Sequence, residues 1–313
     1  MTELKNSSNA TYSLLHFALF NDTTTAALLT TLGLVCFLVN VTITSLFLID
    51  PLRSLRRPSG YLVASLNAGA ILTSVSSVIA SLPGLRHRTV IPVNVCFAIY
   101  SVAATASFTF IFIMSYERYV LVTAPIKYKR VVSVGRVQIL AVSVWVCSVV
   151  IGVSLFKSLS SAGFLWLSIP FATLYVILFC IDVKTFIEIK KINSSIGGIT
   201  ESEFQRSPLN QAMKNRIDMQ TKFARVVVLL LVNFLFLASP IFVFHTMSKL
   251  NHNCAFCLFE HATTMNIYEA TIVMFIFHDI NTALFYLILI PKYRMSLVAI
   301  FKKCNTMRRS LFS

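Results

Sequence analysis

The sequence predicts an all-α membrane protein, a seven-transmembrane helix bundle with its amino terminus outside the cell. Two features of the composition and pattern predict this fold class. The chain is 56% hydrophobic and only 12% charged, whereas soluble domains are about a quarter charged. Its long apolar stretches must be helices, because a single segment in lipid can satisfy its backbone hydrogen bonds only within itself.

Seven apolar stretches are the predicted transmembrane helices. Each exceeds the roughly 20 residues that cross about 30 Å of hydrocarbon. They cover residues 25–49, 60–83, 91–121, 135–156, 163–187, 223–248 and 266–290. Residues 1–24 then form an extracellular segment, 25–290 the membrane domain, and 291–313 a short amphipathic eighth helix with a cytoplasmic tail.

The positions of Lys and Arg predict the orientation. Of the 27 such residues, those that fall on the outer side are only Lys5, Arg86, Arg88, Lys157 and Lys249. Inner segments carry the excess of positive charge in membrane proteins, so the amino terminus is predicted to lie outside. The net charge of +15 is therefore distributed as a lipid bilayer requires, and nucleic acid is not an expected partner.

Three glycosylation sequons support the same orientation. Asn6, Asn9 and Asn21 each begin an Asn-x-Ser/Thr motif before the first span, where glycosylation requires the lumenal side. The first 24 residues are polar and lack the apolar core of a cleavable signal peptide. The first span is therefore expected to act as a signal anchor.

Two other classes of membrane protein find little support in the sequence. A transporter is expected to show internal repeats, broken helices or charges at the membrane midplane; no internal repeat is evident, and the sequence offers few of the other features. An enzyme needs a convergent set of catalytic groups, but the six His residues are scattered. No catalytic residue, metal site or cofactor is predicted.

The stretch MSYERYVLVTAPIKY, residues 114–128, closes the third predicted span. Arg118 lies where this helix leaves the hydrocarbon, a place where a charge is costly unless it is paired or hydrated. The neighbouring Glu117 can hold it in a charge-assisted hydrogen bond. Pro125 is expected to bend the loop that follows, and Tyr128 to lie near a surface for a partner.

This stretch resembles the rhodopsin-like G-protein-coupled receptors, and most closely odorant receptors of the fish type. The residues in register with the odorant-receptor pattern are Met114, Tyr116, Arg118, Tyr119, Val120, Pro125 and Tyr128, with Glu117 in place of the acid. The resemblance implies a plasma-membrane receptor that binds a small organic ligand, such as an odorant, and activates a heterotrimeric G protein. A peptide or lipid receptor of the same fold, or a membrane transporter, is the alternative. The residues it assigns to coupling and activation are Glu117, Arg118, Tyr119, Pro125, Tyr128, Gln220, Pro240, Asp279 and Asn281.

Several positions depart from the family pattern. Leu72 falls where span two usually carries an Asp, so Asp279 of span seven is expected either to supply that carboxylate or to serve as a hydrogen-bonded structural residue. Thr282 replaces the usual proline of span seven. Gln220 replaces the acid that often faces the arginine from span six. A resting link from this span would then be a neutral hydrogen bond or would use Asp218, which predicts a weaker lock. Pro240 is retained, and its missing donor lets the inner half of span six swing.

The predicted ligand site is the cavity between helices in the outer half of the bundle. Counting whole turns outward from Arg118, Pro240 and Asp279 gives its residues: Tyr100, Ala104, Thr105, Phe108, Ile241, Phe244, His245, Glu269 and Ile272. The set is mostly apolar, and simple helix packing is the alternative role for its apolar members. The outer half of span three carries no acid, which argues against an amine ligand.

The cysteines depart from the family as well, since the second outer loop has no cysteine to pair with span three. On the oxidising side we expect either a bond from Cys96 to Cys254 or Cys257, or a small Cys254–Cys257 ring. Cys304, after the amphipathic segment, is expected to be either a palmitoylation site or an ordinary free thiol.

Overall fold

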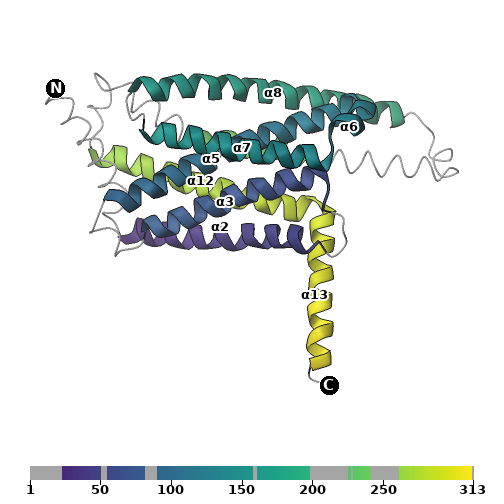
Figure 1. Ribbon diagram of the computed structural model, residues 1–313, viewed down its shortest axis with the longest axis horizontal. Coiled ribbons are helices and arrows are strands. Elements are labelled where there is room, and N and C mark those ends of the chain that lie inside the picture. Colours follow the sequence, from purple (N-terminus) through teal and green to yellow (C-terminus); the bar gives the residue numbers. More distant parts are fainter. Residues whose placement is uncertain are drawn as a thin grey trace.

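The computed structural model describes residues 23–50, 55–81, 90–157, 161–197, 225–226, 228–240 and 261–311. The helices of the bundle lie side by side along one axis (Figure 1). They are α2 (Thr23–Ile49), α3 (Pro58–Ser81), α5 (Val90–Thr123), α7 (Val134–Lys157), α8 (Ser161–Gly197) and α12 (His261–Leu289). Of the sixth predicted span, the structure describes residues 225–226 and 228–240, and these include the π-helical turn η1 (Phe234–Ala238).

Five of the described helices, α2, α3, α5, α7 and α12, contain a stretch long and apolar enough to cross a membrane. These helices cover five of the predicted spans. The fifth predicted span lies inside α8, which continues past residue 187 to Gly197. Residues 228–237 of the sixth span form a shorter apolar helix.

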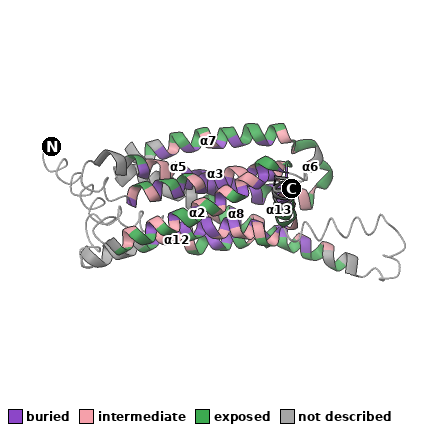
Figure 2. Cartoon of the chain, turned by 90° about the horizontal axis from the view of Figure 1, so that it is seen from below, coloured by how far each residue is buried: buried purple, intermediate pink, exposed green. Residues whose placement is uncertain are grey.

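Helix α5 is the centre of the bundle, packing against α3, α7 and α8, while α2 packs against α3 and α12. Buried residues gather on the faces that the helices turn toward one another, whereas α7 is exposed along much of its length (Figure 2). Two glycines allow α5 to approach closely. A Cβ on Gly152 would lie 2.9 Å from the backbone nitrogen of Val102, and one on Gly69 would lie 2.8 Å from the hydroxyl of Ser107.

Two further helices, α6 and α13, lie at the same end of the bundle (Figure 1). α5 ends at Thr123, and α6 (Pro125–Val131) begins at once with Pro125 in its first turn, where the missing N–H of proline costs no hydrogen bond. α13 (Pro291–Leu311) follows α12 after a single residue and runs crosswise to the bundle. The predicted bend at Pro125 is thus a break between two helices.

Candidate functional site at the α6 end of the bundle

The ion pair that the sequence predicts lies at the end of α5. Nη2 of Arg118 is 3.6 Å from Oε2 of Glu117, and both residues are buried. The separation is too long for the predicted hydrogen bond, so the contact is electrostatic. Burial keeps it strong, because buried pairs are screened by water and salt far less than exposed ones.

The hydrogen bond to Glu117 comes instead from α6. The hydroxyl of Tyr128 donates to Oε1 of Glu117 over 2.7 Å. Burial raises the pKa of Tyr128, and the adjacent Glu117 carboxylate raises it further, so the phenol stays protonated as a donor. Glu117 therefore links α5 to the short helix of the loop, with Arg118 on one oxygen and Tyr128 on the other.

Other charged side chains surround this pair. Nζ of Lys184 on α8 lies 5.4 Å from the ring centroid of Tyr119, within the range of a cation–π contact. Burial lowers the pKa of Lys292 at the start of α13, and the positive charges of Arg57 and Arg118 lower it further. The end of the bundle where α6 and α13 lie is therefore strongly basic.

Asp50 organises the first loop at this end. It has a positive φ of 31°, which an Asp tolerates better than most side chains. Its carboxylate accepts the backbone N–H groups of Leu55 at 3.1 Å and Arg56 at 3.2 Å. Burial raises the pKa of Tyr293 on α13, and the nearby Asp50 carboxylate raises it further. Asp50 therefore lies where the first loop meets the start of α13.

A polar network that the sequence did not predict joins the sixth span to α12. Nδ2 of Asn233 lies 2.8 Å from Nδ1 of His278 and donates to the His278 carbonyl at 2.9 Å. Asn281 donates to Oδ1 of Asn233 at 3.2 Å, and Thr282 donates to the His278 carbonyl at 2.8 Å. The signal available in the sequence was a lone amide in an apolar span, a residue type that usually has a partner there.

The π turn begins directly after Asn233. The N–H of Ser239 bonds the carbonyl of Phe234, five residues back, and Pro240 follows. Such turns are frequent at functional sites, and a proline beside one weakens the helix further. The sixth span therefore carries its weak point next to the residue that ties it to α12.

Asp279 is buried inside the bundle, where Thr73 of α3 lies beside its carboxylate. Cys36 of α2 is also nearby. Leu72, which spacing equated with the family's acid, is instead 38% exposed on the outside. The carboxylate of Asp279 thus faces α2 and α3 from α12.

The described residues of the predicted ligand site are packed among neighbouring helices. Ala104, Thr105 and Phe108 are buried, and the hydroxyl of Thr105 donates to the Ser101 carbonyl of its own helix at 2.8 Å. Phe108 packs against Phe234 with ring centroids 5.1 Å apart.

Nearer the other end of the bundle, Tyr100 packs against Phe275 at 4.8 Å, and the partly buried Ile272 packs on the same core. Tyr100 and Ile272 therefore both pack on the main hydrophobic core of the bundle. Glu269 lies in α12, and its side chain is not among those described.

Several predicted site residues lie outside the described part of the chain. They are Asn6, Asn9, Asn21, Gln220, Ile241, Phe244, His245, Cys254 and Cys257. Cys96 is buried and carries a free thiol, so its predicted bond to Cys254 or Cys257 is not formed here. The Cys254–Cys257 ring remains a prediction.

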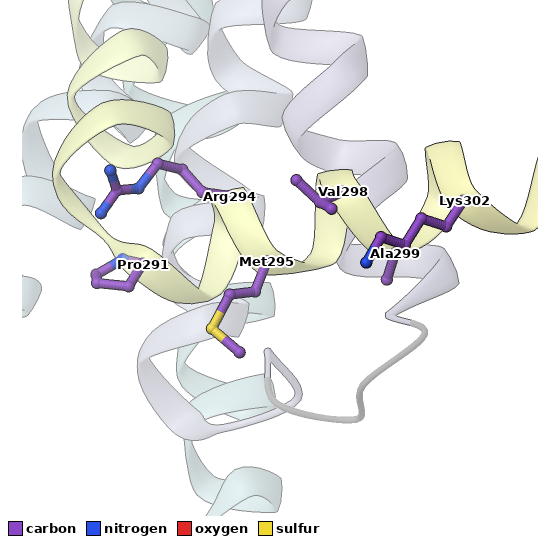
Figure 3. A pocket seen from close by; sticks show the side chains of 6 residues that line it. All are labelled: Pro291, Arg294, Met295, Val298, Ala299 and Lys302. Atoms are coloured by element: carbon purple, nitrogen blue, oxygen red, sulfur yellow. The ribbon is translucent and has the colours of Figure 1, made fainter.

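α13 contains the segment predicted to be amphipathic. Met295, Val298 and Phe301 are exposed on it, as the apolar face of a surface helix would be. A shallow hollow of about 480 Å³ runs along this helix, lined by Pro291, Arg294, Met295, Val298, Ala299 and Lys302 (Figure 3). Cys304 also lies in α13, outside the described side chains.

The chain also matches the model of a known protein family. Residues 39–278 match the family model of the 7 transmembrane receptor (rhodopsin family). That range includes the Glu117–Arg118 pair and the Asn233–His278 link. No curated protein matches the chain.

Proposed function

Because the chain belongs to the rhodopsin family of seven-transmembrane receptors, we propose that it is a chemosensory receptor that activates a heterotrimeric G protein. The family consists of multi-pass membrane receptors rather than enzymes, with a ligand and a G protein as their partners in general. The finer assignments, a small organic ligand of the odorant kind and a plasma-membrane location, extend the likeness of residues 114–128 to odorant receptors. The amino terminus is outside in this proposal, and α13 lies on the inner leaflet.

The observation that carries the proposal is the Glu117–Arg118 pair with its hydrogen bond from Tyr128. A buried arginine at the end of a span is costly unless a partner or water receives it. The Glu117 carboxylate that pairs with it accepts a hydrogen bond from Tyr128 of α6, and in this proposal α6 moves away from α5 on activation. Arg118 can therefore pass from an internal partner to an external one when this end opens.

The moving part in this proposal is the inner half of the sixth span. Its π turn and Pro240 weaken the helix next to Asn233. Ligand binding in the outer half would shift a two-state equilibrium toward the open form, by as much as the ligand prefers that form. The Asn233–His278 contact holds the closed arrangement, and Asp279 and Asn281 belong to the same interior polar region.

The test is nucleotide exchange on purified Gα subunits by the receptor in lipid nanodiscs, with a panel of small organic molecules. The receptor should accelerate exchange, and Arg118→Ala should reduce it by about tenfold or more at equal receptor concentration, since a loss of about 1.4 kcal/mol suffices for that factor. Arg294→Ala on the exposed side of α13 is the control and should retain exchange. Exchange that is unchanged in Arg118→Ala would overturn the assigned role of Arg118. Flux of solutes into liposomes without any Gα would favour a transporter instead.

A further inference from the structure

A serine and an arginine at the junction between α6 and α7 are not among the coupling residues above. α6 ends at Val131 and α7 begins at Val134, so Ser133 lies in the short break between them, where it is exposed. Its hydroxyl oxygen accepts the backbone N–H of Arg136 at 3.4 Å, as a cap of α7 does. A hydroxyl can accept this bond and still carry its own proton. The Ser133 hydroxyl is therefore accessible to an enzyme from solution.

The sequence before Ser133 is of the kind that basophilic protein kinases select, because such kinases recognise substrates by their charge pattern. Arg130 stands three residues before the serine, and Lys127 and Lys129 precede it. Residues 118–181 contain no Asp or Glu. No acid on either side of the serine therefore opposes binding to the acidic groove of such an enzyme.

The local backbone also suits a kinase, which binds its substrate as an extended chain. Val132, directly before Ser133, is already extended, with φ −97° and ψ 94°. A Cβ added to Gly135 would meet no atom within 4 Å, so there is open space two residues after the serine. α6 has only seven residues, fewer than the roughly 12–15 at which isolated helices become stable. Its last turn, which contains Arg130, can therefore unwind onto an enzyme.

The guanidinium of Arg136 connects this junction to the coupling site. Its Nη1 donates to the carbonyls of Arg130 and Val131, at 3.1 Å each. Carbonyls at a helix end have no donor within the helix, and a cation near them stabilises the last turn. The same short helix carries Tyr128, whose hydroxyl donates to Glu117. Arg136 of α7 is thus placed to stabilise the helix that holds the acid of the ion pair.

We propose that Ser133 is a phosphorylation site for a basophilic serine/threonine kinase, and that its phosphate takes the Arg136 guanidinium away from α6. The Ser133 oxygen attacks the γ-phosphorus of ATP, so a new O–P bond forms while the bond to the ADP leaving group breaks. The hydroxyl proton passes to the base of the kinase. This inference rests on the proposed function, in which the α6 end of the bundle faces the cytoplasm and its ATP.

Charge decides the direction of the effect. Phosphoserine carries a charge of about −1.5 to −2 at pH 7, and a guanidinium bonds a phosphate about twice as strongly as it bonds a neutral carbonyl. The phosphate would also lie at the amino end of α7, where the helix dipole favours an anion, and just past the carboxyl end of α6, where the dipole disfavours one. Phosphorylation should therefore loosen the last turn of α6 and weaken the bond from Tyr128 to Glu117.

The first measurement is phosphate incorporation into the full receptor in nanodiscs, with ATP, Mg²⁺ and the catalytic fragment of protein kinase C, followed by peptide mass spectrometry. Ser194 is the matched control. It is also exposed and also follows a basic residue, Lys191, by three positions, but it lies within α8 with its hydroxyl bonded to the Lys191 carbonyl at 3.0 Å. Ser133 should be modified about tenfold or more faster than Ser194, because a helix must unwind before a kinase can bind it. A receptor without phosphate on Ser133 would overturn the proposal.

The second measurement is a double-mutant cycle on thermal unfolding, which tests the link from the phosphate to Tyr128. The melting-temperature difference between wild type and Tyr128→Phe should shrink by about half or more when Ser133 is phosphorylated, because the bond is then already weak. Arg136→Ala should shrink the same difference without phosphate, and Arg136→Lys should restore part of it. The difference between wild type and Tyr116→Phe is the control and should stay constant. An equal Tyr128→Phe difference with and without phosphate would overturn the proposed action on α6.

Nucleotide exchange on Gα then separates this inference from the proposed function. Treatment with the kinase should raise basal exchange several-fold in the wild-type receptor and leave it constant in Ser133→Ala, since the proposed closed form depends on the Tyr128 bond. Phosphorylation of Ser133 that shrinks the Tyr128→Phe difference without exchange on any Gα would support this inference and overturn the G-protein function. Exchange by a receptor that takes no phosphate on Ser133 would overturn this inference alone.

Discussion

Replacing Tyr128 with Phe tests the link between α6 and the ion pair most directly. The change removes one hydroxyl and leaves the ring in place. That hydroxyl donates over 2.7 Å to a buried carboxylate oxygen. In the variant, Oε1 of Glu117 loses its hydrogen-bond donor although Glu117 is buried. The carboxylate keeps only its 3.6 Å ionic contact with Arg118.

The structure sets the size of the effect. A hydrogen bond to a charged group contributes about 1.5–3 kcal/mol to the free energy of unfolding. Removing the donor loses this contribution and leaves the buried acceptor unsatisfied. At roughly 2–4 °C for each kcal/mol, the melting temperature should fall by about 3–12 °C. If only the closed form makes this bond, the open form also becomes about ten-fold or more populated relative to it, and basal signalling should rise.

Thermal unfolding of the purified receptor in nanodiscs measures the first effect, and basal second-messenger output at matched surface expression measures the second. Tyr116→Phe is the matched control, because Tyr116 is 53% exposed on α5 and should lose little. Equal melting temperatures for the two variants would refute the view that Tyr128 holds Glu117.

The pKa of Tyr128 gives this prediction a dependence on pH. Folding raises the pKa above its ordinary value of 10.0. The contribution of Tyr128 to stability is therefore complete below about pH 10 and falls as pH rises beyond it, since only the unfolded chain then ionises. The difference between wild type and Tyr128→Phe should shrink above about pH 10 and stay constant between roughly pH 6 and 9.

The remaining predictions concern the interior of the bundle. Asn233→Ala should lower stability by about 1–3 kcal/mol, because it leaves the buried His278 without its amide partner; an unchanged denaturation midpoint would contradict the link. Gly152→Ala should destabilise by about 1–3 kcal/mol, because the added Cβ would lie 2.9 Å from the Val102 nitrogen. Gly135→Ala in the same helix is the control, because its added Cβ meets no atom within 4 Å, and it should stabilise by up to about 1 kcal/mol. Equal shifts in melting temperature for Gly152→Ala and Gly135→Ala would show that the approach to Val102 is not tight.

The seven-helix fold could be predicted because lipid leaves a spanning segment few choices. Apolar length alone marks the spans, and the family match confirms the bundle. The break at Pro125 was predictable for a similar reason, since proline fixes its own φ and lacks a donor. The orientation of the amino terminus is still a prediction from charge.

The partners of individual side chains could not be predicted in the same way. Neighbours in sequence suggested that Glu117 would hydrogen-bond Arg118, whereas the donor is Tyr128 from the next helix. Leu72 was assigned by spacing to an interior place, but the rotation of α3 turns it outward. Such errors arise because one residue of register turns a helical side chain by about 100°, which composition does not reveal.

The π turn after Asn233 has a consequence for how the sixth helix can change shape. A turn closed from Ser239 to Phe234 contains one residue more than a regular α-helix would place there. Conversion of this turn to α-helix would rotate one side by about 100° against the other and shift it by about 1.5 Å. Asn233 directly precedes the π turn. The hydroxyl of Ser239 donates a hydrogen bond to the carbonyl of Leu235 in that turn. The helix thus contains an offset of one residue, and removing that offset would change its shape in a single discrete step rather than by a gradual bend.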